Sequence, residues 1–507
     1  MDLRPADRRV AAHGRRLHGS RTSYDKYVFV LATVVTAVTT ARRPRGLTLA
    51  PVALLGLAAV IGLMAGVHPA IGIGLALAVI FLLVATWDLA LGVCGFVLLA
   101  PLDVISSDSD VSLTKAVGAL LVLAWVAAAA SQGVSKRSLI TSQPWLTTFL
   151  VGFIAWSALS AVWAQSTSDA YRSTIRFALN AVLFPIIYLA VRDRRRVVWI
   201  LAVFVLGAQL SVVWGFVHGP SGDSTVTMLN AQGGRLTGAR GDSNVLATLL
   251  LVSTVFAAAL AIVLRGIPLA APLSLGAALL GLVALFATFS RGGVVALIVV
   301  VLVGLIYGGR WRKGMAALGL TALLVGVAYV AGPAGGGTGS DRLLESSTSG
   351  RSSIWTVGWR MVTANPVIGV GSGNYTTAES QYLLTSPGLL PADQFILDTP
   401  YVAHNIYLHV LAEMGVIGLF LFVGLLALSI GSAMRAVRIA KAHDDRSLEV
   451  LGRALVMALA GILAADFFVS EQYSKQLWVL LALGPVLLSI AQRLPDRSAA
   501  RDAALRG

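Results

Sequence analysis

Two contrasting segments of the chain meet at Gly415. The polar segment before it reads Tyr401-Val-Ala-His-Asn-Ile-Tyr-Leu-His-Val-Leu-Ala-Glu-Met-Gly415, and an apolar run follows from Gly415 to Met434. Because a membrane helix needs about 20 predominantly apolar residues, the run is long enough to cross a bilayer. The His404–Asn405 pair therefore lies near the boundary between water and lipid, where a polar segment enters the membrane. This position suits chemistry on a lipid-attached substrate.

The composition is that of a membrane protein. Of the 507 residues, 57% are hydrophobic and 12% are charged, whereas a soluble domain has roughly 25% charged residues. The net charge of +15 does not indicate nucleic-acid binding, because the Lys and Arg residues cluster in short segments between apolar runs, as the positive-inside rule predicts. A single cysteine, Cys94, excludes an intrachain disulfide.

Apolar runs recur along the chain and predict an all-α, polytopic membrane protein with about 14 transmembrane helices. Tyr27–Thr40 is short for a span. The candidate spans are Tyr27–Thr40, Leu47–Gly66, Ala70–Thr86, Leu89–Val104, Val111–Ala130, Trp145–Trp163, Ile175–Val191, Val197–Phe216, Asn244–Leu264, Pro268–Phe289, Gly292–Tyr307, Gly314–Val330, Gly415–Met434, Val450–Val469 and Gln476–Ile490.

Basic residues orient these spans. From Lys136 onward they occupy every second loop, which predicts that those loops are cytoplasmic. Both termini are then cytoplasmic, although the basic N-terminal tail and Arg42-Arg43 can both lie inside only if Tyr27–Thr40 does not span. The basic loops contain Lys136-Arg137, Arg192, Arg194-Arg195-Arg196, Arg265, Arg310, Arg312-Lys313, Arg435, Arg438, Lys441 and Arg446. The loops predicted outside are Ala164–Thr174, Val217–Ser243, Ser290-Arg291, Ala331–Met414 and Ser470–Lys475.

The chain divides by composition into five parts. They are a basic cytoplasmic tail (1–26), transmembrane helices with short loops (27–330), a large extracytoplasmic loop (331–414), the C-terminal transmembrane helices (415–490) and a cytoplasmic tail (491–507). In the large loop, Ile354, Val357, Met361 and Val362 recur at helical spacing and predict an amphipathic helix from Arg351 to Ala364. Asn365-Pro366 ends it, and a tight turn is expected over Gly369–Gly373.

Four local patterns resemble the O-antigen ligase and O-antigen polymerase family of polysaccharide-assembly membrane enzymes. The resemblance covers roughly Arg196 to Phe422, and Ser243 stands where the family often has proline. The patterns are Arg235-Leu-Thr-Gly-Ala-Arg-Gly-Asp-Ser-Asn244; Thr288-Phe-Ser-Arg-Gly-Gly293; Arg351 with Trp355, Asn365-Pro366 and the glycines 369, 371 and 373; and His404-Asn405 with Leu408, Glu413 and Gly415.

This resemblance implies a glycosyltransferase in the bacterial plasma membrane with its active site on the extracytoplasmic side. The donor would be a glycan on a polyprenyl diphosphate, and the acceptor would be a sugar hydroxyl of a glycolipid or a growing polysaccharide. The resemblance also implies inversion at the anomeric carbon, no metal and no cofactor. It leaves open whether the enzyme is a ligase or a polymerase.

Three arginines are candidates for the donor diphosphate. A guanidinium binds phosphate through two parallel hydrogen bonds and keeps its charge in a poorly hydrated site. Arg235, Arg240 and Arg291 all fall in segments predicted outside. Snorkelling to lipid phosphates is the alternative for each.

His404 is the candidate catalytic residue, since an imidazole can take a proton from the acceptor hydroxyl near neutral pH. Asn405, Arg351 and Trp355 are candidate substrate-binding residues. Asn405 can instead cap the following helix, and Trp355 can instead anchor at the interface. Glu413 lies one turn beyond His409 and is expected to pair with it.

Two other functions compete with this hypothesis. Asp108 and Asp110 lie in a predicted outer loop and form an Asp-x-Asp pair that a metal-dependent membrane glycosyltransferase could use. A transporter or flippase of lipid-linked sugars is the other alternative, although the sequence has neither the internal repeats nor the clustered midplane charges typical of transporters.

Overall fold

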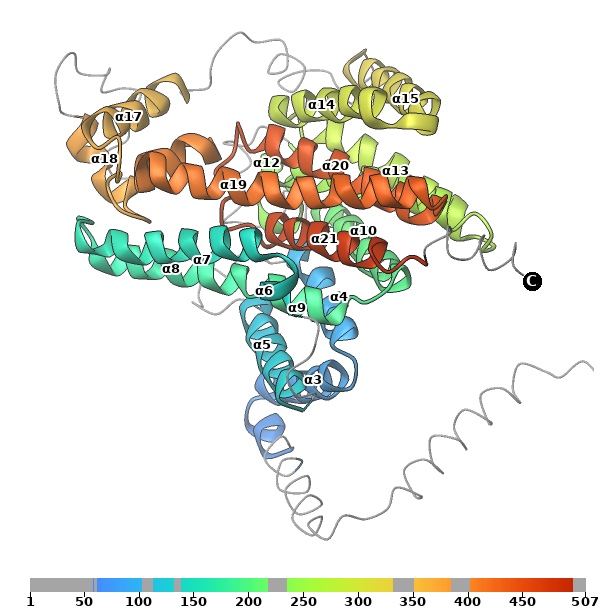
Figure 1. Cartoon of the computed structure of the whole chain (residues 1–507), viewed down its shortest axis with the longest axis horizontal. Coiled ribbons are helices and arrows are strands. Elements are labelled where there is room, and N and C mark those ends of the chain that lie inside the picture. The colour runs from blue at the N-terminus through green and yellow to red at the C-terminus, as the bar shows by residue number, and fades with distance from the viewer. Residues whose placement is uncertain are drawn as a thin grey trace, which may run out of the picture. The chain divides into compact units, whose positions relative to one another are not determined.

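The computed structural model describes residue 58 and residues 62–102, 113–131, 138–217, 235–331, 351–383 and 402–495. Every regular element in these residues is a helix (Figure 1). The chain divides into two compact units, Met1–Leu77 and Ala78–Gly507. Helix α3 (Pro69–Trp87) contains the boundary between them.

The second unit contains the remaining helices. In chain order they are α4 (Leu89–Leu99), η1 (Ala100–Leu102), α5 (Leu113–Ser131), α6 (Leu139–Ser142), α7 (Pro144–Leu159), η2 (Ser160–Val162), α8 (Thr167–Ala181), α9 (Leu183–Ala190), α10 (Arg194–Val217), η3 (Gly238–Arg240), α12 (Ser243–Val263), α13 (Ala270–Ala287), α14 (Arg291–Tyr307), η4 (Gly309–Trp311), α15 (Arg312–Ala331), α17 (Arg351–Ala364), α18 (Tyr375–Leu383), α19 (Ile406–Ala442), α20 (Arg446–Ala465) and α21 (Lys475–Ala491).

The described residues include nine helices that are long and apolar enough to cross a membrane, and three shorter apolar helices. The all-α, polytopic prediction is therefore confirmed, whereas the count of about 14 spans is not. Tyr27–Thr40 and most of Leu47–Gly66 lie outside the described residues.

Helices α12, α19, α20 and α21 form the centre of the second unit (Figure 1), where α20 packs against the other three and against α14. In the apolar 18-residue stretch of each helix, 78% of the residues of α12 and 83% of those of α20 are buried. Protein rather than lipid therefore surrounds these two helices. On α21, the fully buried Trp478 packs edge-to-face on Phe184 of α9.

Two predicted boundaries are wrong. The predicted outer loop Ala164–Thr174 is helical from Thr167, because the Ser166 hydroxyl caps α8 by accepting from the Asp169 N–H at 3.3 Å. The predicted span Val450–Val469 ends instead at Ala465, since Asp466 and the residues after it leave the helix.

The predicted span Gly415–Met434 is part of a longer helix. Helix α19 extends from Ile406 to Ala442, with a kink at Gly415 (φ 63°, ψ −170°). The kink frees backbone groups for other partners: the Met414 carbonyl accepts from Trp156 Nε1 at 2.9 Å, and the Val416 N–H donates to the Pro366 carbonyl at 2.9 Å. Gly415 therefore ties the polar segment both to α7 and to the segment after α17.

Three of the segments predicted to be cytoplasmic meet at one end of the bundle. Arg194 pairs with Asp445 at 3.4 Å, and Arg310 pairs with Asp444 at 3.9 Å. Arg310 and Arg453 also both bind the buried Glu449 carboxylate. The structure thus groups these loops as the alternation of basic residues predicts.

The described part of the large loop packs on α19. Helix α17 has the predicted bounds. In the turn that follows, Gly369, Gly371 and Gly373 all have positive φ. The Val370 and Gly371 N–H groups donate to the carbonyls of Ala412 and Glu413 at 2.9 and 2.8 Å. A Cβ at Gly369 would lie 2.4 Å from the Glu413 carbonyl carbon, so the close approach requires glycine there.

Candidate functional site

His404 lies in a strained turn just before α19. It is half-buried, and its φ of 45° places a non-glycine residue in the left-handed region, which histidine tolerates better than most residues. Asn405 follows as the N-cap, and its side-chain oxygen accepts from the N–H groups of Tyr407 and Leu408, both at 3.0 Å. The capping alternative for Asn405 is therefore confirmed. Its substrate-binding role stays a prediction.

Neighbouring segments hold the His404 turn in place. The Ala403 carbonyl accepts from Trp355 Nε1 of α17 at 3.0 Å. On the other side, the Asn405 N–H donates to Ser470 Oγ at 3.2 Å, and the Ile406 N–H donates to the Asp466 carbonyl at 2.9 Å. A strained turn persists only when its surroundings determine it, and such turns concentrate at functional sites.

A second group of polar residues gathers where α12 and α14 begin. Arg235 donates through Nε to the Thr288 carbonyl at 2.7 Å and through Nη2 to Asn244 Oδ1 at 3.0 Å. Ser290 Oγ donates to the same Asn244 oxygen at 2.9 Å and caps α14 by accepting from the Gly293 N–H. Arg291 is the first residue of α14. We call Arg235, Asn244, Ser290 and Arg291 the arginine cluster.

The arginine cluster has the chemistry of an anion site. It places the Arg235 guanidinium at the N-termini of α12 and α14, the second of which begins with Arg291, and a helix N-terminus favours negative charge. Two of the four sequence patterns, which are separate in the chain, thus meet here.

The segment 466–470 connects the arginine cluster to His404. Phe468 packs on Gly292, where a Cβ would come within 3.1 Å of Phe468 Cβ. The Phe467 ring lies edge-to-face on Trp355, with centroids 5.7 Å apart. Since Asp466 and Ser470 bind the backbone at His404, this single short segment touches the surroundings of both groups.

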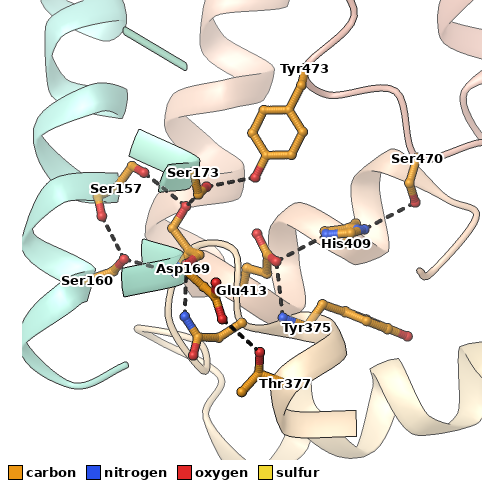
Figure 2. A network of polar contacts seen from close by, with 12 residues as sticks. Ser157, Ser160, Asp169, Ser173, Tyr375, Thr377, His409, Glu413, Ser470 and Tyr473 are labelled. Atoms are coloured by element: carbon orange, nitrogen blue, oxygen red, sulfur yellow. Dashed lines mark hydrogen bonds and ion pairs between the residues drawn. The ribbon is translucent and has the colours of Figure 1, made fainter. Parts of the chain in front are cut away.

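Buried polar residues support the site from the side of the large loop (Figure 2). The Glu413 side chain is 2% exposed, and its Oε1 accepts from the Tyr375 N–H at 3.1 Å. His409 Nε2 bonds the same oxygen at 3.1 Å, and His409 Nδ1 bonds Ser470 Oγ at 3.2 Å. The predicted pairing of Glu413 with His409 is confirmed, and it extends to the segment that holds His404.

The same figure shows how the glycine turn docks on α7 and α8. Ser372 accepts from Ser157 Oγ at 2.9 Å and donates from its backbone N–H to Ser160 Oγ at 2.9 Å. Ser372 also bonds Ser173, whose hydroxyl bonds the Tyr473 phenol at 2.7 Å. Burial raises the pKa of the Tyr473 phenol, and the Glu413 carboxylate raises it further. Tyr473 is therefore neutral near pH 7 and can serve in this hydroxyl network.

One part of the chain matches a known protein family. Residues 276–423 match the family model described as O-antigen ligase. The chain carries an O-antigen ligase domain. The protein is a multi-pass membrane enzyme of the glycosyltransferase type that works in polysaccharide biosynthesis. Its family implies lipid-linked glycan substrates. No curated protein matches the sequence.

The O-antigen ligase domain contains only part of the site. Ser290, Arg291, Trp355 and His404 lie within the matched residues, as do Glu413 and the glycine turn. Arg235 and Asn244 precede the matched residues, and the segment 466–470 follows them. The match thus begins later than the Arg196-to-Phe422 resemblance in the sequence, and it ends at nearly the same residue.

The structure describes the other predicted site residues only in part. Arg240 ends η3 and Arg351 begins α17, but neither side chain is among the described ones. Asp108 and Asp110 lie outside the described residues, in 103–112. Trp355 is half-buried against the His404 turn, whereas Trp359 is 57% exposed. Of the two tryptophans, only Trp355 contacts the site.

Sequence reasoning missed Asp466. Its side chain is fully buried, and neither carboxylate oxygen has a hydrogen-bond partner in the part of the chain that the structure describes. An acidic residue inside a predicted span was the available signal, because such residues are expensive in a membrane and therefore indicate function. The hydroxyl network of Ser157, Ser173 and Tyr473 carried no comparable signal.

Proposed function

We propose that this enzyme moves a glycan from a polyprenyl diphosphate carrier to a sugar hydroxyl of a glycolipid or growing polysaccharide, with inversion and without a metal ion. One observation carries the proposal: the segment 466–470 packs on Gly292, next to Arg291 of the arginine cluster, and also bonds the backbone beside His404. A site for an anionic leaving group and a candidate base therefore share one support.

The arginine cluster would serve the leaving group. The diphosphate gains negative charge as the glycosidic bond breaks, and cations already held in place lower that barrier without reorganising. Asn244 and the Thr288 carbonyl fix the Arg235 guanidinium. Arg291 stands at the first turn of α14, where the helix dipole adds to its charge.

His404 would serve the acceptor. The imidazole takes the proton from the acceptor hydroxyl as its oxygen bonds to the anomeric carbon. The bond between that carbon and the diphosphate oxygen breaks on the opposite face, and its electron pair leaves with the diphosphate. A single displacement of this kind inverts the anomeric configuration. The strained backbone at His404 supports the role, because strain collects where a side chain must be aimed.

The test uses purified, reconstituted enzyme with a lipid-linked donor. His404→Ala should lose about 10²-fold or more in rate, the usual contribution of general acid–base catalysis. Wild-type enzyme should keep its rate in excess chelator. If chelation stops turnover and divalent ions restore it, the metal-free mechanism is wrong and Asp108 and Asp110 become the candidates. Near-normal turnover of His404→Ala at matched protein level would remove His404 from the mechanism.

We also propose that this site faces the outside of the bacterial plasma membrane. The alternation of basic loops supports this orientation, because the basic loops gather at the opposite end of the bundle. Single cysteines at the exposed positions Thr363 and Lys441, in a Cys94→Ala background, test it in intact cells. An impermeant thiol reagent should label position 363 only. Labelling of position 441 alone would reverse the orientation.

A further inference from the structure

A chain of hydrogen bonds connects the large loop to the turn just before α19. It begins at the Tyr375 N–H, which donates to Glu413 Oε1 at 3.1 Å. Figure 2 shows the next two links: the same oxygen bonds His409 Nε2 at 3.1 Å, and His409 Nδ1 bonds Ser470 Oγ at 3.2 Å. The last link is the Asn405 N–H, which donates to Ser470 Oγ at 3.2 Å.

The two ends of this chain fix the direction of the bonds between them. A backbone N–H can only donate, so Ser470 Oγ accepts at one end. At the other end Glu413 Oε1 already accepts from the Tyr375 N–H, and a carboxylate oxygen can accept again, from the Nε2–H of His409. A neutral imidazole that donates from Nε2 has a lone pair on Nδ1, and this lone pair accepts the Ser470 hydroxyl proton.

Packing holds the imidazole of His409 in this orientation. The side chain is 5% exposed, and its ring stacks on the Tyr375 ring with centroids 5.0 Å apart. Hydrogen bonds in such a poorly hydrated place are stronger than in water, and successive bonds polarise one another. The ring is therefore a fixed bridge between the large loop and Ser470.

The Ser470 bond fixes the peptide group that follows His404. The Asn405 N–H belongs to this peptide group, so its direction sets the ψ angle of His404. The φ of His404 is 45°, a left-handed conformation that a non-glycine residue keeps only when its surroundings hold it. The next N–H, of Ile406, is held separately by the Asp466 carbonyl at 2.9 Å.

We propose that Ser470 and His409 are positioning residues that aim His404 while the large loop is docked. This role rests on the proposed function, in which His404 is the base, and it adds what sets the geometry of that base. No proton moves along the chain during the reaction. When the loop leaves, Glu413 loses the Tyr375 N–H, and the support of the peptide group after His404 weakens.

Ser470→Ala breaks the chain at the end nearest the base. It should lower kcat at least about tenfold, because a small misplacement of a reacting group is costly. The KM for a lipid-linked donor should stay within about twofold of wild type, since the arginine cluster is unchanged. Trypsin should cut at the half-buried Arg360 of α17 at the wild-type rate, because the loop contacts remain. A wild-type kcat would overturn the proposal.

Ser474→Ala is the matched control. This serine follows Ser470 closely in the chain, but its hydroxyl donates to Gln476 Oε1 at 2.7 Å. Its kcat and KM should match wild type. If Ser474→Ala lowers kcat as much as Ser470→Ala, general loosening of the connection between α20 and α21 is the cause, and the positioning role is wrong.

Two amides at position 409 test which end of the imidazole matters. In His409→Asn the side-chain oxygen lies near the former Nδ1 and can accept from Ser470. In His409→Gln the amide lies near the former Nε2 and can bond only Glu413. His409→Asn should therefore keep most of the wild-type kcat, whereas His409→Gln should lose as much as Ser470→Ala. Equal kcat values for the two amides would overturn the proposal.

A double variant shows whether Ser470 acts through His404. A positioning residue has no effect once the group that it aims is gone. Ser470→Ala should therefore change the residual rate of His404→Ala less than about twofold, although it slows the wild-type enzyme at least about tenfold. A tenfold loss in both backgrounds would mean an independent role for Ser470 and would overturn the proposal.

The two proposals fail in different ways. If His404→Ala turns over like wild type, the proposed base is wrong, whatever Ser470→Ala does. If His404→Ala is slow and Ser470→Ala transfers glycan at the wild-type rate, the positioning role is wrong and the proposed function stands.

Discussion

Replacing Glu413 with alanine should release the large loop from the membrane bundle without unfolding the bundle. The Glu413 carboxylate is buried and accepts from both the Tyr375 N–H and His409. These two partners belong to different parts of the site: Tyr375 begins α18 in the loop, and His409 reaches Ser470 beside the His404 turn. One side chain therefore joins the loop to the end of α19 that follows His404.

The magnitude follows from the two groups that lose their acceptor. A buried donor left without a partner costs about 1–3 kcal/mol, so the pair costs roughly 2–6 kcal/mol. The backbone bonds from Val370 and Gly371 to α19 remain, and so do the Ser372 hydroxyl contacts. The loss should therefore favour local opening of the loop over global unfolding. Two kcal/mol alone raises the open population by about thirtyfold.

Limited trypsin digestion of the reconstituted protein measures this opening. Arg360 in α17 is half-buried and bonds the Tyr382 carbonyl at 3.0 Å, so cleavage there requires the loop to open. Glu413→Ala should be cut at Arg360 at least about thirtyfold faster than wild type if the loop recloses faster than trypsin cuts. Glu413→Gln keeps the accepting oxygen and should restore most of the protection.

Asp169→Ala is the control. Its carboxylate accepts one hydrogen bond, from Thr377 at 3.1 Å, at a partly exposed position, so cleavage should stay near the wild-type rate. The reasoning fails if Glu413→Ala is cut like wild type. It also fails if Glu413→Gln is as labile as Glu413→Ala, since the hydrogen-bond acceptor would then not be the cause.

Three further variants test other contacts. Arg291→Ala should slow transfer roughly ten- to a hundredfold. Arg291→Lys should restore little of the rate, because an ammonium cannot replace the two parallel hydrogen bonds of a guanidinium. A near-normal initial rate from either variant at matched protein level would contradict the diphosphate role. Asp466→Asn should keep or raise the melting temperature, because both carboxylate oxygens are buried without a partner among the described residues, and a drop of several degrees would reveal a partner for the charge. Gly415→Ala should sharply lower the yield of monodisperse protein in size-exclusion chromatography, since its Cβ would lie 2.1 Å from the Val367 carbonyl oxygen; Gly431→Ala on the same helix has open space and should match wild type.

Local sequence rules predicted the elements that local chemistry determines. Helix α17 has the predicted ends because its apolar spacing and the following Asn365-Pro366 act within one stretch of chain. The tight turn over Gly369–Gly373 is also present, and its three glycines have positive φ. The hydrogen bond between Glu413 and His409 needed only the fact that both lie on one helix.

The errors lie where distant contacts decide the structure. Thr167–Thr174 reads as a polar loop, but the Ser166 hydroxyl caps a helix there. Distant packing stabilises that helix, since Ala170 and Ser173 are buried and Ser372 bonds Ser173. Hydropathy placed Asp466 and Phe467 inside a span, whereas the backbone there leaves the helix and its carbonyl accepts from Ile406. No rule of periodicity includes a partner sixty residues away.

The proposed site depends on distant contacts as well as local ones. The proposed reacting groups His404 and Arg291 lie within the matched domain, but most of what aims them comes from elsewhere in the chain. The segment 466–470 holds the backbone just after His404 and packs on Gly292. Ser157 of α7 and Ser173 of α8 hold the glycine turn through Ser372. Contacts from several elements would fix the distance between the proposed base and the leaving group more tightly than the large loop alone could. Substitutions in α7 or α8 should therefore lower turnover through misalignment.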